Sequence, residues 1–472
     1  MTTNTIDEKF IAQCQNKFSK DPMNVVARNA ITSIGSTIPC IDSERLNKVT
    51  HIFQHSVKKK NVKATNQGSS GRCWIFAGLN MYRHHIINAL GLENFEYSET
   101  FVYFWDKFER SNSFLQWFID NSGEFAPGDR EFDYMLEGYM TDGGYWNFFA
   151  SIVNKYGMVP KNCMKETFHS DYSGEMNVFI EELLKSAAYR IYNGQVTNPQ
   201  TFKKQCLERI WNTLVKFLGE PPKDFEWAFT KEEDDMGGTL VPDLDPHKMS
   251  EMGLKVKDYI VLGNAPSEKM SYKKMYEIKY TSTVTGGQPC RILNLPIKEL
   301  TKYALKSVQK GIPVWFAADV NHFFNPYNST LDDKLIDRNH LLPMGSEELD
   351  KGESILFKNI EGNHAMTLVG VNVDSEGNPT EWQVENSWGY WDNETPGEDG
   401  FLTMSQSWFE KYVVQVVIHK DMLTRAMKRL VGRLKPIVIE PWEAGAPAFK
   451  VKGNINPPKS WTRGLNKKNN QQ

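Results

Sequence analysis

The hydrophobic pattern of this chain changes along its length, and this change is the strongest constraint on its fold. In the first half, apolar residues recur every three to four positions, which predicts amphipathic helices at 73–90, 100–110, 177–192 and 199–217. From about residue 310 onwards, short apolar runs bounded by turn residues predict strands at 312–317, 365–371, 381–386 and 413–419. Because the helices precede the strands and do not alternate with them, we expect an α+β fold.

Composition shifts divide the chain into regions. Residues 1–215 form an N-terminal region and a helical lobe, and residues 301–440 form a strand-rich lobe. Between them, residues 216–300 mix proline, glycine and charged residues with short strand-like runs. We therefore expect 216–300 to be an inserted arm that contributes to oligomerisation.

Composition excludes several classes of protein. Of the 472 residues 40% are hydrophobic and 12% aromatic, which is enough for a large folded core. The formal net charge of -3 argues against a dedicated nucleic-acid binder, which needs a marked excess of basic residues. No stretch approaches the roughly 18 apolar residues of a membrane helix, and residues 1–10 lack the apolar run of a signal peptide. We expect no membrane association and a cytoplasmic location.

The six cysteines are widely spaced and include no Cys-x-x-Cys pair. This spacing indicates neither a zinc site nor a dense disulfide framework. Reduced thiols in the cytoplasm fit best, and we expect the protein to need neither a metal nor an organic cofactor.

Cys73 lies where a Gly/Ser-rich loop, residues 67–72, runs into an apolar helical pattern. The first turn of a helix carries unpaired N–H groups and a partial positive charge, which favour a thiolate. Gln67, six residues upstream, has a side-chain amide that can donate to a developing oxyanion. An isolated cysteine is more often a buried core thiol, so Cys73 needs partners to be interpreted as a nucleophile.

Two later segments supply such partners. His364 begins an apolar strand pattern, and Asn386 ends the next one. A nucleophilic cysteine needs a base that removes and returns a proton, and the base needs a group that fixes its tautomer. Cys73, His364 and Asn386 match these three roles. Trp388 is expected to shield the Asn–His hydrogen bond from water, which strengthens it.

Three blocks of the sequence resemble the catalytic blocks of papain-like cysteine peptidases, and in particular the bleomycin hydrolase/aminopeptidase C branch. They are Gln67-Gly-Ser-Ser-Gly-Arg-Cys-Trp74, His364-Ala-Met366 and Asn386-Ser-Trp-Gly389. Further matching blocks lie at 104–110, 142–146, 155–160, 313–319 and 441–442. The resemblance spans nearly the whole chain, to about residue 449, and implies a two-lobed papain-like fold with a helical lobe and a β-barrel-like lobe.

The resemblance also implies roles for individual residues. Cys73 would be the nucleophile, with its own backbone N–H as the second oxyanion donor beside Gln67, while His364 would be the general base and acid and Asn386 its orienting partner. Gly143 and Gly144 resemble the glycine pair whose backbone aligns an extended substrate; an ordinary turn is the alternative interpretation of this pair. Trp74 and Trp388 would support the site from behind.

The family further implies hydrolysis of peptide or amide bonds at substrates with a free N-terminus, including the bleomycin amide, and a homohexamer without cofactors. Secreted relatives read Cys-Gly-Ser-Cys-Trp at the nucleophile, where this chain reads Ser70-Gly-Arg-Cys-Trp74. The disulfide partner is therefore absent, as a reducing compartment requires.

The C-terminus departs from the family pattern. Residues 441–449 resemble the arm that carries the terminal carboxylate into the cleft, where it pairs with the substrate's amino group. Here the chain continues through Lys450–Gln472, which holds six Lys or Arg and no acidic residue, so the first 449 residues carry a net charge of -9. Three explanations remain open: self-trimming near 446–449, a blocked or altered specificity, or a flexible basic tail that leaves the cleft.

Two other functions remain as alternatives. The same triad would serve a thiol acyltransferase, which passes the acyl group to an amine and not to water. Alternatively, the basic tail would give a peptidase secondary nucleic-acid binding, although the acidic body makes this unfavourable.

Overall fold

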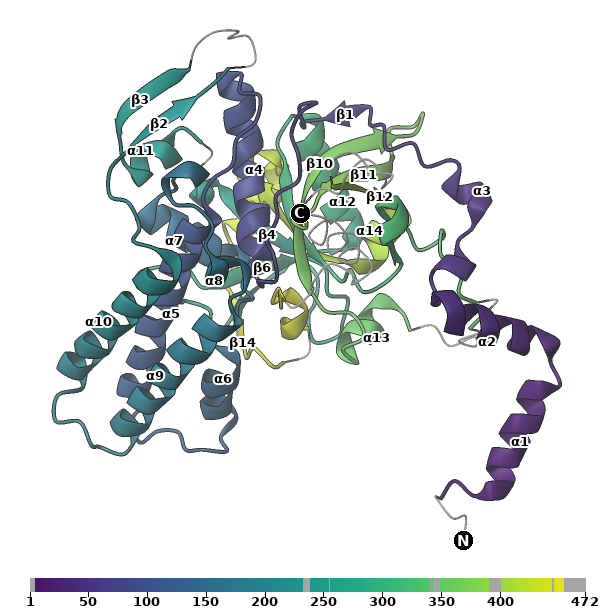
Figure 1. Cartoon of the computed structure of the whole chain (residues 1–472), viewed down its shortest axis with the longest axis horizontal. Coiled ribbons are helices and arrows are strands. Elements are labelled where there is room, and N and C mark those ends of the chain that lie inside the picture. Colours follow the sequence, from purple (N-terminus) through teal and green to yellow (C-terminus); the bar gives the residue numbers. More distant parts are fainter. Residues whose placement is uncertain are drawn as a thin grey trace, which may run out of the picture.

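The computed structural model describes residues 5–231, 238–253, 255–339, 341–342, 349–389, 400–443 and 445–453. A helical lobe and a sheet lobe lie side by side, with the long helix α4 (Cys73–Leu90) between them (Figure 1). Fourteen of its eighteen residues are buried, so α4 is a central helix of the core and not a surface helix. The α+β architecture predicted from the sequence is confirmed.

The helical lobe is built mainly on three long helices that pack together. They are α5 (Glu99–Asp120), α9 (Gly174–Tyr192) and α10 (Pro199–Leu218). Aromatic side chains fill the space between them: the Trp105 ring of α5 stacks on Tyr156 at 3.8 Å between centroids and also contacts Trp211 of α10. The shorter helices of this lobe are α6 (Arg130–Gly138), α7 (Trp146–Tyr156) and α8 (Phe168–Asp171).

Twelve strands of the described residues form one mixed sheet. Its order is β14-β5-β6-β4-β13-β7-β10-β11-β12-β9-β8, and β1 pairs with β10 outside this path. The bounds of these strands are β1 (His55–Ser56), β4 (Tyr259–Gly263), β5 (Lys274–Ile278), β6 (Cys290–Asn294), β7 (Val314–Ala318), β8 (Phe324–Asn325), β9 (Thr330–Leu331), β10 (His364–Val373), β11 (Pro379–Glu385), β12 (Phe401–Ser405), β13 (Val413–His419) and β14 (Ile437–Ile439).

The centre of the sheet is covered on both faces. Every residue of β7 and the first eight of β10 are buried, which explains why these strands are continuous apolar runs without alternation. Helices α4 and α12 (Ile297–Gln309) pack against β10, and α14 (Gln406–Tyr412) packs against β11 and β12. Two short helices, α13 (Lys351–Leu356) and α15 (Arg425–Val431), complete this lobe.

The predicted inserted arm, residues 216–300, does not form one unit. Its first part is a hairpin of β2 (Phe225–Phe229) and β3 (Thr239–Leu244), followed by α11 (Pro246–Glu251), beside the helical lobe (Figure 1). Its second part, β4 to β6, lies within the main sheet, where β4 pairs with β13. The sequence did not indicate this pairing because the partner strands come from a distant part of the chain.

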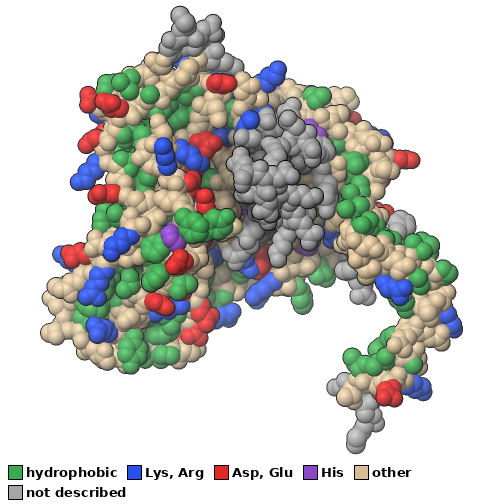
Figure 2. All heavy atoms as spheres, viewed as in Figure 1, with side chains coloured by type: hydrophobic (Ala, Val, Ile, Leu, Met, Phe, Trp, Pro, Cys, Tyr) green, Lys and Arg blue, Asp and Glu red, His purple; other side chains and the backbone are tan. Residues whose placement is uncertain are grey.

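The N-terminal helices extend away from both lobes (Figure 1). They are α1 (Glu8–Ser19), α2 (Pro22–Ile34) and α3 (Ser43–Leu46), and no residue of α1 is buried. On the face seen in Figure 2, basic and acidic side chains are interspersed over both lobes. Within the described ranges, no helix combines the length and the apolar character that a bilayer crossing requires.

Candidate active site

Cys73 is the first residue of α4, so its backbone and side chain lie at the positive end of the helix dipole. No side chain caps this end, since Arg72 at the N-cap position makes no capping hydrogen bond. Cys73 has no exposed surface, and this burial raises the pKa of its thiol to about 12. The backbone N–H groups of Ala365, Trp74 and Cys73 itself act in the opposite direction and lower this pKa.

His364 and Asn386 meet beside this helix end. His364 opens β10, Asn386 follows directly after β11, and the two strands are antiparallel neighbours. The Nε2 of His364 lies 2.8 Å from Oδ1 of Asn386. An amide oxygen only accepts, so Nε2 carries the proton and Nδ1 of the neutral ring is an acceptor. No described group hydrogen-bonds to Nδ1, which leaves it available to take a proton.

Burial also acts on the histidine. It lowers the pKa of His364 to about 4, while the hydrogen bond from Nε2 to Asn386 opposes this change. Burial therefore acts against the charged form of both Cys73 and His364.

Two tryptophans lie next to the catalytic residues. The Trp388 ring stacks on His364 at 4.8 Å between centroids and is almost fully buried, so it covers one face of the imidazole. Trp74 donates its indole N–H to the carbonyl of Asp142 at 2.8 Å. This bond joins the nucleophile's helix to the loop that carries Gly143 and Gly144.

Gln67 is fixed at both ends of its side-chain amide. Its Nε2 donates to the carbonyl of Ser70 at 2.7 Å, and its Oε1 accepts from the Ser387 hydroxyl at 2.6 Å. The Gln67 backbone N–H donates to the Ser387 carbonyl at 2.9 Å. Because the Ser70 carbonyl only accepts, the amide nitrogen must lie at that end of the side chain, and its second hydrogen is free of the Ser70 bond.

Gly143 and Gly144 contact the chain's own C-terminal residues 451–453, and we call the place where this segment lies, between Gly144 and the Gly362–Asn363 backbone, the cleft. Val451 and Gly144 exchange two backbone hydrogen bonds, of 2.9 and 3.0 Å, in an antiparallel bridge. A Cβ on Gly143 would lie 2.2 Å from the carbonyl oxygen of Val451. The absence of a side chain at Gly143 is therefore what permits an extended backbone to approach this closely.

The same segment continues over the catalytic residues. Lys452 N–H donates to the Gly362 carbonyl and Gly453 N–H to the Asn363 carbonyl, both at 3.2 Å. Gly453 adopts φ +70°, and a Cβ there would lie 2.3 Å from the carbonyl oxygen of Gly71. This path joins the loop before Cys73 to the backbone before His364, and both side chains are fully buried.

These contacts change two predictions about the C-terminus. Of the predicted arm, residues 441–449, the last four form a 3-10 helix whose Phe449 packs near Gly263. Residues 451–453, which the sequence predicts to be part of a basic extension, form the backbone bonds to Gly144, Gly362 and Asn363. The remaining residues of that extension, 454–472, lie outside the described part of the chain.

Several residues that hold the site were not singled out from the sequence. Ser387 orients Gln67, and Asp142 accepts hydrogen bonds from Tyr103 and Asn177 behind the glycine pair. Arg110 donates to the carbonyl of Gly143 at 2.7 Å. The only sequence signal for these residues was their position inside the matching blocks, since each acts through contacts with distant segments.

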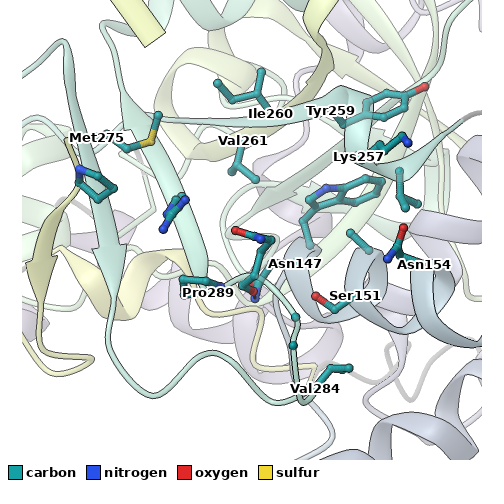
Figure 3. A pocket seen from close by; sticks show the side chains of 18 of the residues that line it. Asn147, Ser151, Asn154, Lys257, Tyr259, Ile260, Val261, Met275, Val284 and Pro289 are labelled. Atoms are coloured by element: carbon teal, nitrogen blue, oxygen red, sulfur yellow. Dashed lines mark hydrogen bonds between the residues drawn. The ribbon is translucent and has the colours of Figure 1, made fainter. Parts of the chain in front are cut away.

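A separate cavity of about 840 Å³ lies between α7, β4 and the loop at 284–289 (Figure 3). Trp146, Ile260, Val261 and Met275 contribute apolar surface to it. Its described lining contains no cysteine, histidine or carboxylate. It does contain Ser151, Tyr259 and three lysines, but it holds no cysteine–histidine pair like that of Cys73 and His364. In the described residues, no group of three or more His, Cys, Asp or Glu is arranged to bind a metal.

The chain is similar to known proteins over most of its length. Human bleomycin hydrolase is 30% identical over 458 residues, covering 94% of this chain and 98% of that protein. Aminopeptidase C of Lactococcus lactis subsp. cremoris is 32% identical over 448 residues, covering 93% and 98%. The crystal structure of PepW from Lactobacillus rhamnosis HN001 superposes with a TM-score of 0.87 at 28% identity, covering 94% of this chain and 99% of PepW. Residues 5–446 match the Peptidase C1-like family, and the chain belongs to that family.

Proposed function

We propose that this cysteine aminopeptidase hydrolyses peptide and amide bonds at substrate N-termini through an acyl-enzyme on Cys73. His364 removes the thiol proton through Nδ1, and the Cys73 sulfur attacks the scissile carbonyl carbon. The oxyanion accepts hydrogen bonds from the Gln67 side chain and the Cys73 backbone N–H. His364 then returns the proton to the leaving amine, and a water molecule that His364 activates hydrolyses the thioester.

The observation that carries this proposal is the pairing of His364 Nε2 with Asn386 Oδ1 at 2.8 Å, beside a cysteine at a helix N-terminus. This hydrogen bond leaves the unprotonated Nδ1 as the ring nitrogen that can accept a proton. Replacement of Cys73 by Ser should abolish hydrolysis of aminoacyl fluorogenic amides while the far-UV circular dichroism spectrum stays unchanged. Activity of C73S equal to wild type would reject the role of Cys73.

The C-terminal segment supports the substrate-binding role of Gly143 and Gly144. It lies in the cleft as an extended peptide with a two-bond bridge to Gly144, which is the geometry expected of a bound substrate backbone. A substrate and this segment use the same hydrogen-bonding groups, so both cannot occupy this part of the cleft together. The segment therefore limits how many residues a substrate can place on the acyl side of the scissile bond, as an aminopeptidase requires.

Aminopeptidase action further needs a group that pairs with the substrate's amino terminus, and a free chain end in this cleft would supply a carboxylate. We therefore propose that the chain is shortened within or just after the cleft segment, beyond the earlier expected 446–449. Intact mass spectrometry of purified wild type should show loss of the residues that follow the cleft segment. Full-length mass in C73S, the matched control, would identify Cys73 as the agent. If purified wild type has the full-length mass and still shows aminopeptidase activity, the proposed shortening is wrong.

We also propose a cytoplasmic homohexamer. Support for assembly comes from the extended N-terminal segment, in which Ile6 before α1, Phe10 in α1, and Met23 and Val26 in α2 are exposed apolar side chains in the single chain. Support for a reducing compartment comes from the cysteines, all six of which are free. Analytical ultracentrifugation tests the assembly, and a monomer at micromolar concentration would reject it. Cell fractionation tests the location.

A further inference from the structure

The loop between Gln67 and Cys73 is held by a fully buried arginine. Arg72 makes a two-pronged ion pair with Glu166, with Nη2 to Oε2 at 2.9 Å and Nη1 to Oε1 at 3.3 Å. Glu166 in turn accepts a hydrogen bond from the Ser170 hydroxyl. Two parallel bonds fix the plane of the guanidinium as well as its position, which a lysine ammonium cannot reproduce.

The Nε of Arg72 contacts the loop of residues 67–72, which carries the oxyanion donor Gln67 and is called the oxyanion loop. Arg72 Nε donates to the Ser70 hydroxyl at 2.8 Å, and that hydroxyl donates to the Gln67 carbonyl at 2.6 Å. The Ser70 carbonyl then accepts from the Gln67 side chain at 2.7 Å. Through Ser70, a rigid ion pair therefore controls both the backbone and the amide of Gln67.

A second contact anchors the loop to the same region as Glu166. The Ser69 N–H donates to the Asp171 carbonyl at 2.8 Å, and a Cβ on Gly68 would lie 3.0 Å from Asp171. The loop thus packs directly on α8, the helix that follows Glu166. A shift of Glu166 or Arg72 would move the whole segment that carries the oxyanion donor.

The charge of Arg72 is balanced within its own contacts. Glu166 faces the guanidinium and offsets its positive charge, and Asp171 Oδ1 lies 3.7 Å from Nη2. The bond from Nε to Ser70 therefore connects Arg72 to the geometry of the loop.

We infer that Arg72 and Glu166 are positioning residues for the oxyanion donor Gln67, acting through the Ser70 hydroxyl. This inference rests on the proposed function, because it requires Gln67 to stabilise the oxyanion. The Arg72–Glu166 pair should stabilise the oxyanion of the transition state and not the bound substrate. Its loss should therefore lower kcat and leave KM nearly unchanged.

The test compares R72K, S70A and Q67A singly, and R72K and S70A again in the Q67A background. R72K keeps the positive charge but loses the bond from Nε to Ser70. S70A keeps the Arg72–Glu166 ion pair and loses only the hydroxyl that links Arg72 to the Gln67 carbonyl. R72K and S70A should each lower kcat about 10- to 100-fold in an aminoacyl amide assay. A misplaced oxyanion donor is nearly as costly as the missing donor of Q67A. Added to Q67A, neither should lower kcat further, because its route of action is already gone.

Two measurements separate positioning from general damage. Alkylation of Cys73 by iodoacetamide passes through no oxyanion, so its rate should match wild type in R72K and S70A. The control is R45K, which alters an arginine–carboxylate pair of similar length, Arg45–Asp332 at 2.7 Å, that has no bond to Gln67. R45K should retain the wild-type kcat. If R72K does not fold, S70A carries the test alone.

The outcomes distinguish this inference from the function on which it rests. A Q67A variant with wild-type kcat would overturn the proposed oxyanion role, and a wild type without turnover would overturn the proposed function itself. If Q67A is impaired while S70A and R72K keep the wild-type kcat, only the positioning inference is wrong. Additive losses in the double variants, or alkylation slowed in parallel with kcat, would likewise overturn it.

Discussion

Replacement of Gly453 by Ala should open the active-site cleft. Four backbone hydrogen bonds hold residues 451–453: two to Gly144 and one each to Gly362 and Asn363. Each bond stabilises the closed state by about 0.5–1.5 kcal/mol net, so the four contribute about 2–6 kcal/mol. The conformational entropy lost when these residues become ordered offsets most of this. The closed state is therefore stabilised only modestly, and a small penalty should shift its population.

The penalty follows from the geometry of Gly453. Its φ of +70° costs an alanine about 1–2 kcal/mol, and the new Cβ would meet the Gly71 carbonyl oxygen at 2.3 Å. A loss of 1–2 kcal/mol corresponds to about a 5- to 30-fold rise in the open fraction. The clash with Gly71 places the expected value at the upper end of that range.

Hydrogen–deuterium exchange of the Gly144 amide measures this opening, because that N–H donates to Val451 in the closed state. The C73A background prevents self-cleavage during the measurement. Exchange should accelerate about 5- to 30-fold in C73A/G453A relative to C73A. The matched control is Gly219→Ala, at a glycine with φ +85° and no atom near its missing Cβ. Unchanged exchange at Gly144, or equal acceleration by the control, would refute the reasoning.

Further predictions concern the catalytic pair and a buried charge cluster. Asn386→Ala should lower kcat about 100-fold and His364→Ala more, because the first disturbs orientation and the second removes the base; equal losses in steady-state assays would contradict the orienting role. Glu385→Ala should destabilise the fold by about 3–5 kcal/mol in urea denaturation, because it leaves Arg83 buried without its ion-pair partner, and a loss below about 1 kcal/mol would contradict this. Arg83 holds the pKa of the Glu385 carboxyl below its ordinary 4.5 despite burial, so its stabilising contribution should be full above about pH 4.5 and decline as the pH falls further. Glu385→Gln should flatten that decline, and an unchanged pH dependence would contradict the assignment.

Local pattern was sufficient to predict the elements that carry the catalytic residues. The apolar spacing after Cys73 predicted a helix that begins at that residue, and the run from His364 predicted a strand. Both are decided by neighbours in the sequence, because helix and strand periodicities are properties of short segments. The residue types Cys, His and Asn then restricted the chemistry, and the resemblance identified the family.

Tertiary structure decided where the chain's end lies and what holds the oxyanion loop. Sequence pattern alone counted 450–453 with the basic extension, whereas residues 451–453 bond to Gly144, Gly362 and Asn363. The partner of Arg72 was equally hidden, because Glu166 comes from a distant segment. Strand pairing, close approach at glycines and buried ion pairs all join residues far apart in the chain. Their energies depend on the packed arrangement, and no local pattern encodes which segments will meet.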